Sequence, residues 1–237
     1  MLRREESPKS SRCMLFLRGI GAVWVSAPGG GGRFRGGIEP FTWGSFLLYQ
    51  SPRSLYLKNV EIAEDFLPLR SSAAALMCAA RWHKELSKRM MPGHGEDALI
   101  SLLWGSMKNL SRNLSPLLLD IRFVWRWANL WGVAPSLDLC PECGSPLAEA
   151  SGNPVSASPA GFLCDTCAQS ARRGVSSNAE VRPASVTRDA FAIIRASSCL
   201  SAENFVRGEA ANRMIVSNSQ PLEKELKDAA RWFYSFL

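Results

Sequence analysis

Residues 139–168, LCPECGSPLAEASGNPVSASPAGFLCDTCA, contain four of the seven cysteines of this 237-residue chain. They form two C-x-x-C pairs, Cys140 with Cys143 and Cys164 with Cys167. Two such pairs can place four thiolates at the corners of a tetrahedron, which is the geometry in which Zn²⁺ binds sulfur. The spacing therefore predicts one zinc ion per chain, held by these four side chains.

The predicted ion is structural rather than catalytic. Four thiolates fill the coordination shell of zinc and leave no position for a reacting water. The alternatives are two unrelated cysteine pairs or a redox dithiol, although a redox C-x-x-C normally stands alone beside a βαβ pattern. Among the other cysteines, Cys78 and Cys199 lie in apolar helical patterns and are predicted to be small core side chains.

Composition places the chain among globular proteins, with 46% hydrophobic and 21% charged residues. No uncharged apolar run approaches the roughly 18 residues that span a bilayer. The N-terminus resembles a secretory signal only in part, because Arg18 interrupts its apolar stretch and Glu5 and Glu6 dilute its positive start. We therefore expect a cytoplasmic protein, in which paired cysteines bind metal instead of forming disulfides.

Positive charge gathers in the first quarter of the chain. The net charge is +7, and residues 1–60 carry nine Lys and Arg against three Glu, which leaves +6. Such a basic segment favours a polyanion partner, most simply nucleic acid. Charge that serves only solubility is the alternative.

Residues 13–62 are predicted to form β-structure. Short apolar runs rich in β-formers alternate with turn residues, which gives four strand candidates: residues 13–19, 21–28, 41–50 and 54–62. A glycine-rich loop at 28–37 separates the second candidate from the third. Four short strands and a long loop are typical of a small barrel or sandwich.

From about residue 68 the apolar spacing becomes helical. Helices are predicted at residues 71–90, 95–114, 115–132, 186–200 and 221–237. The third is predicted to be the central buried helix, because only Arg122, Arg126 and Asn129 form a polar stripe on it. The last helix is predicted to pack on the others through one apolar face: Leu222, Leu226, Ala229, Phe233 and Phe236.

The predicted fold class is therefore α+β with two domains. A small β-barrel domain spans 1–66 and a helical domain spans 67–237, with the zinc module inserted at about 138–170. The composition of 144–162 indicates a loop, and 169–182 is predicted to be flexible.

The glycine-rich loop contains two candidate DNA contacts. Arg33 and Arg35 could meet a nucleic-acid backbone, and Phe34 between them could stack on a base. A loop that only connects two strands is an equal alternative. A P-loop is excluded, because no Gly-Lys-Ser/Thr follows the glycines.

Catalytic groups are sparse. His83 and His94 are the only two histidines, and neither has a convincing Ser or Cys partner. Surface or packing roles are expected for both. The sequence offers no carboxylate cluster either, so we do not expect an enzyme.

Four stretches together follow the pattern of one known family: GIGAVWVSAP (19–28), IEPFTWGSFLLYQ (38–50), SLYLKNVEI (54–62) and FVWRWANLWGVAPSLDLCPECG (123–144). They resemble the RecO family of bacterial recombination mediators. The most specific part is an aromatic helix followed by Leu-x-Gly-x-x-Pro and two C-x-x-C pairs. The resemblance implies an N-terminal OB-fold, then a helical domain with a four-cysteine zinc module.

The resemblance also implies site residues. The zinc ligands carry over as Cys140, Cys143, Cys164 and Cys167, and Arg33 and Arg35 carry over as candidate DNA contacts. Two departures exist. The first strand of the barrel would be short or missing, because Met1 stands near its expected end, and the glycine loop replaces a segment that is usually more basic.

The function implied by the resemblance is not enzymatic. The protein would bind single- and double-stranded DNA, anneal complementary strands, and work with RecR to load RecA onto DNA coated by the single-stranded-DNA-binding protein. One alternative is a zinc-ribbon protein–protein adaptor whose basic charge is incidental. A nuclease is a third possibility, disfavoured by the missing carboxylate cluster.

Overall fold

The computed structural model describes residues 1–6, 10–29, 33–34, 36–147, 155–157, 161–174, 186–208 and 220–237. The chain divides into two compact units, Met1–Pro116 and Leu117–Leu237. The predicted limits at 1–66 and 67–237 differ from this division, because two helices group with the sheet.

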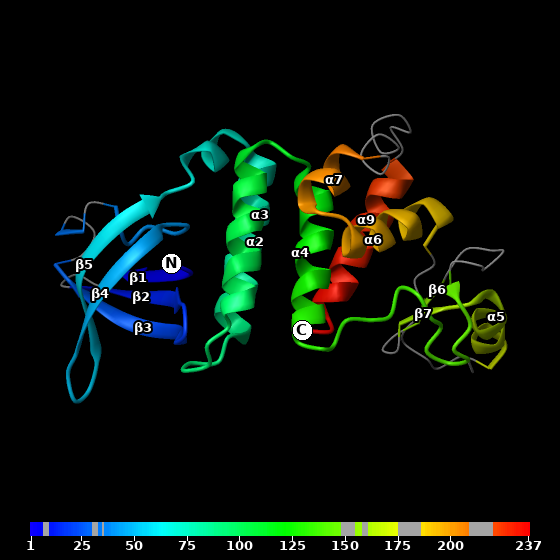
Figure 1. Ribbon diagram of the computed structural model, residues 1–237, viewed down its shortest axis with the longest axis horizontal. Coiled ribbons are helices and arrows are strands. Elements are labelled where there is room, and N and C mark those ends of the chain that lie inside the picture. Colours follow the sequence, from blue (N-terminus) through cyan, green and yellow to red (C-terminus); the bar gives the residue numbers. More distant parts are fainter. Residues whose placement is uncertain are drawn as a thin grey trace. The chain divides into compact units, whose positions relative to one another are not determined.

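A five-stranded sheet forms the first part of unit 1 (Figure 1). Its strands are β1 (Arg3–Glu6), β2 (Ser10–Leu17), β3 (Gly21–Pro28), β4 (Trp43–Gln50) and β5 (Leu55–Glu64). The spatial order is β1-β2-β3-β5-β4, with β3 and β5 parallel and the other pairs antiparallel. The four predicted strands are present, and β1 is a short first strand that pairs with β2 over four residues.

The sheet does not close into a complete barrel. Within the described residues, no strand pairing joins β1 to β4. Two backbone hydrogen bonds nevertheless bridge the gap near the chain start: the Met1 amino group donates to Thr42 O at 2.7 Å, and Phe41 N donates to Met1 O. The α+β class is confirmed by this sheet and the helices that follow it.

One face of the sheet holds the core of its strands. Alternate residues point to the same face of a strand, and the buried set follows this rule: Cys13 and Leu15 in β2, Val25 and Ala27 in β3, and Leu57 in β5. Phe34 and Ile38 from the loop between β3 and β4 complete this cluster. These side chains form the buried core of the sheet, which we call the β-core.

Helices α2 (Ala73–Arg89) and α3 (Asp97–Ser111) follow the 3-10 helix η1 (Leu67–Ser71). The Ser72 hydroxyl caps α2 by accepting a hydrogen bond from Ala75 N. Gly21 allows the loop before α3 to approach β3, because a Cβ atom at this position would lie 1.9 Å from His94 O. At the other end of the sheet, Trp104 of α3 packs on Trp43 with a ring-centroid distance of 4.8 Å.

Unit 2 contains α4 (Pro116–Leu130), β6 (Val155–Ala157), β7 (Gly161–Leu163), α5 (Asp165–Gly174), α6 (Arg188–Cys199), α7 (Ala202–Arg207) and α9 (Gln220–Tyr234). Helix α4 is largely buried, as predicted. Its Arg122 and Arg126 donate to carbonyl oxygens at the end of α6, those of Ser197 and Ser198. The polar stripe of α4 thus satisfies the C-terminus of a neighbouring helix.

Helix α9 packs through the predicted apolar face. Leu222, Leu226, Ala229 and Phe233 are buried, and Phe236 is half-buried. The Tyr234 hydroxyl also donates a hydrogen bond of 2.8 Å to the buried Asp120 carboxylate of α4. Packing of the C-terminal helix is therefore confirmed.

Three predictions for unit 2 are wrong. The segment 144–162 is not wholly a loop, because β6 and β7 form a hairpin in it. Residues 169–174, predicted to be flexible, continue helix α5. Cys199, predicted to be a core side chain, is exposed because it ends α6.

No helix in the described part of the chain is long and apolar enough to cross a membrane.

Candidate metal centre

The first cysteine pair lies in a tight turn between α4 and β6. Cys140 N donates to Ser145 O at 2.9 Å, and Gly144 N donates to Cys140 O at 2.9 Å. Gly144 has a φ of 73°, a conformation that glycine adopts without steric cost. This backbone turn brings Cys140 and Cys143 to the same side of the loop.

The second pair lies where a strand passes into a helix. Cys164 follows β7 directly, and its carbonyl accepts a hydrogen bond from Ala168 N. Cys167 lies in the first turn of α5.

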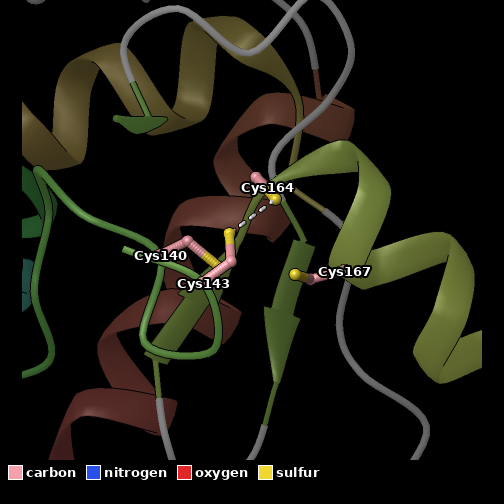
Figure 2. A group of neighbouring side chains, drawn as sticks. All are labelled: Cys140, Cys143, Cys164 and Cys167. Atoms are coloured by element: carbon pink, nitrogen blue, oxygen red, sulfur yellow. Dashed lines mark hydrogen bonds between the residues drawn. The ribbon is translucent and has the colours of Figure 1, made fainter. Parts of the chain in front are cut away.

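Figure 2 shows the four side chains turned toward one another, two from the loop and two from the start of α5. Their sulfur atoms all lie within 4.8 Å of one another, and Cys143 Sγ lies 3.5 Å from Cys164 Sγ. A tetrahedral zinc site with bonds of about 2.3 Å requires sulfur separations of about 3.8 Å. The four cysteines are therefore close enough together to bind a metal ion, and sulfur donors fit zinc or iron.

Hydrogen bonds shift the pKa values of Cys143 and Cys167 in opposite directions. The pKa of Cys143 is lowered to about 6, first because the Ser145 hydroxyl, 3.3 Å from its sulfur, can donate to the thiolate. The pKa of Cys167 is raised to about 12, first by its hydrogen bond with Cys143. The set therefore begins to lose protons at Cys143, and loss of protons is what metal binding requires of thiols.

Residues beside the cysteine cluster pack against the helices of unit 2 in two places. Phe162 of β7 packs edge-on against Phe191 of α6 and Trp232 of α9, with ring-centroid distances of 5.1 and 4.9 Å. Asp138, just before the first pair, forms an ion pair with Arg195 of α6 at 2.9 Å. Sequence reasoning missed these residues, because partners far apart in the chain leave no local pattern.

The structure describes Arg33 and Phe34 of the glycine-rich loop. Arg33 is exposed, and its guanidinium lies 5.4 Å from the centre of the Phe34 ring. Phe34 cannot stack on a base as predicted, because it is only 7% exposed and belongs to the β-core. Arg35 lies outside the described residues.

The two histidines occupy different environments. His83 in α2 is buried against Phe41, and its Nδ1 lies 2.9 Å from Ala79 O. Burial lowers the pKa of His83 to about 3, so the ring is neutral. His94 lies exposed in the loop before α3.

Comparison with known proteins places this site in a family context. Residues 70–184 match the family described as recombination protein O, C terminal. Over these residues the chain is similar to the RecO family. A DNA repair protein RecO from Desulforamulus reducens is 26% identical over 141 residues, which is 60% of this chain and 54% of that protein. One from Heliobacterium modesticaldum is 29% identical over 125 residues, 52% of this chain and 44% of that protein.

The RecO match includes the whole candidate metal centre. All four cysteines lie within residues 70–184, together with α2, α3 and α4. The match to each curated RecO protein spans about half of that protein's length. The predicted resemblance to RecO is confirmed.

Proposed function

We propose that this protein is a DNA-binding recombination mediator of the RecO type. The observation that carries the proposal is the RecO C-terminal match, which encloses the complete four-cysteine cluster. The charge of +6 in residues 1–60 supports a polyanion as the ligand of unit 1.

The sheet of unit 1 would be an OB-fold. An OB-fold is a five-stranded, partly open Greek-key barrel that binds oligonucleotides, and five strands with an open edge agree with this description. Arg33 and Arg35 would contact phosphates from the loop between β3 and β4. The exposure of Arg33 supports this role.

The four cysteines would hold one structural Zn²⁺. Bound there, zinc would join the turn at Cys140 to the start of α5 and would leave no open coordination position. The protein would therefore act by binding and not by catalysis. Its partners would be single- and double-stranded DNA, RecR and the single-stranded-DNA-binding protein, with RecA loaded as the outcome, and its location would be the cytoplasm.

Strand annealing tests this function. Two complementary labelled oligonucleotides should pair faster in the presence of the protein than alone. The Arg33→Ala/Arg35→Ala double variant should anneal them more slowly than wild type, whereas Arg231→Ala, which removes an exposed arginine of α9, should match wild type. If the protein neither binds DNA nor accelerates annealing, the hypothesis of a zinc-ribbon protein–protein adaptor replaces this proposal.

A further inference from the structure

The face of the sheet opposite the β-core carries aromatic side chains on three adjacent strands. Residues paired directly across two strands point to the same face, and Tyr56 of β5 pairs with Tyr49 of β4 on one side and with Ser26 of β3 on the other. Trp24 lies two residues before Ser26 and so shares its face. Trp24, Tyr56 and Tyr49 thus lie on the same face of three adjacent strands, and we name these three residues the aromatic strip.

The aromatic strip is not needed to complete the β-core. The core of these strands is formed on the other face by Val25, Leu57 and their neighbours. Tyr49 is 61% exposed and Tyr56 is 36% exposed. Two of the three tyrosines of the chain therefore lie on one solvent face of one small sheet, where folding alone gives them little to contact.

Basic groups border the aromatic strip. Arg12 of β2 pairs in register with Ser26, and its guanidinium lies 5.1 Å from the centre of the Trp24 ring. Lys58 is exposed at an irregularity of β5, and Arg53 is exposed in the turn between β4 and β5.

Acidic groups on this face are fewer and lie at its margins. Glu5 of β1 pairs in register with Arg12, and Glu61 of β5 pairs with Ser45 of β4. Neither glutamate pairs with a residue of the aromatic strip. Rings bordered by guanidinium and ammonium groups are the combination that binds single strands, because bases stack on the rings while cations contact phosphates.

We propose that the aromatic strip, with Arg12 and Lys58, is the surface on which the bases of single-stranded DNA stack. This inference rests on the proposed function and adds to it the residues and the kind of contact. Stacking on exposed rings requires unpaired bases, whose faces are hidden inside a duplex. The surface would accordingly prefer single strands and tolerate any sequence, since every base has a π-face.

An oligonucleotide without bases isolates the stacking contribution. Binding of the full chain is measured with oligo-dT and with an abasic deoxyribose-phosphate strand of equal length, at one salt concentration. Wild type should bind oligo-dT more tightly. The Tyr49→Ala/Tyr56→Ala variant should lose roughly tenfold or more of its oligo-dT affinity, given the usual worth of base stacking, and keep its affinity for the abasic strand.

Two matched variants control for surface damage. Tyr49→Phe/Tyr56→Phe keeps both rings and should bind oligo-dT like wild type. Leu47→Ala removes a 56% exposed apolar side chain from the same strand and should also bind like wild type. Failure of Tyr49→Phe/Tyr56→Phe to preserve affinity would mean that the rings do not act by stacking, which would overturn the inference.

The remaining outcomes separate this inference from the function on which it rests. If wild type binds oligo-dT but the double alanine variant binds it equally well, DNA binding stands and the aromatic strip is not the contact. If that variant weakens binding to both strands equally, stacking is again excluded. If wild type binds neither strand, the proposed function fails and the inference fails with it.

Discussion

At the scale of single residues, the four clustered cysteines make the sharpest prediction. Protein purified without chelator should contain about one zinc per chain, and Cys143→Ser should lower the metal content because a hydroxyl replaces a thiolate ligand. Cys199→Ser is the matched control, since Cys199 is an exposed cysteine outside the cluster. Elemental analysis measures both variants, and an iron signal in place of zinc would correct the proposed metal.

Removal of the metal should also destabilise the segment around the four cysteines. Zinc binding supplies folding free energy to small modules, on the order of 10 kcal/mol in isolated peptides. Chelator treatment should therefore increase proteolysis between residues 138 and 174, and added zinc should reverse it. Unchanged protease resistance would mean that Phe162 and Asp138 hold this module without metal.

His83 should make the stability of the protein depend on pH. Its pKa is lowered from 6.5 to about 3 by burial, so the unfolded chain takes up the proton more readily than the folded one. The neutral, buried His83 therefore contributes fully to the free energy of unfolding above pH 6.5. As the pH falls from 6.5 toward 3, this contribution is lost, by up to about 1.4 kcal/mol per pH unit.

Chemical denaturation from pH 7 to pH 4 measures this contribution. The free energy of unfolding of wild type should fall more steeply than that of His83→Gln, which cannot take up the proton. Carboxylates titrate in both proteins, so the difference between the two slopes is the quantity to compare. Equal slopes would show that His83 is accessible to protons in the folded state.

At the scale of elements, helix α9 should stabilise unit 2 through its buried face. Leu226 is fully buried, and truncation of a buried leucine to alanine costs about 2–5 kcal/mol. Leu226→Ala should lower the free energy of unfolding by this amount. Lys227→Ala, next to it on the exposed face and paired with Glu223 at the surface, should change stability by no more than about 0.5 kcal/mol. Similar losses for both variants would contradict the packing of α9.

The elements also show where sequence reasoning succeeds and where it fails. The strands β2–β5 and helices α2, α3, α4, α6 and α9 follow from apolar periodicity, because apolar side chains recur on one face of each. The hairpin of β6 and β7 was missed because three-residue strands in a segment rich in Ser, Pro and Gly carry no periodic signal. Phe34 was misjudged because its glycine neighbours indicated a loop, while its own side chain fills the core of the sheet.

The two candidate sites also differ in how far the sequence alone predicts them. The four cysteines were identified from spacing alone, since metal ligands must recur at short fixed intervals to face one ion. The aromatic strip could not be identified, because Trp24, Tyr49 and Tyr56 become neighbours only when β3, β5 and β4 align. The parallel pairing of β3 with β5 is a tertiary feature with no local trace in the sequence.

At the scale of the whole molecule, the two units would have different tasks. Unit 1 carries the basic sheet, and unit 2 carries the metal centre. The central claim is that the protein holds single-stranded DNA chiefly through its phosphates, with unit 1 supplying the cations.

The salt dependence of oligonucleotide binding tests that claim most directly. The logarithm of the affinity for single-stranded DNA should fall linearly with the logarithm of salt concentration, because bound phosphates release counterions. Replacing both Arg33 and Arg35 with alanine should flatten the slope by about 1.4, given about 0.7 per phosphate contact on a single strand, and Arg231→Ala should leave it unchanged. Negligible DNA binding at moderate salt, or a slope indifferent to both loop arginines, would contradict the account.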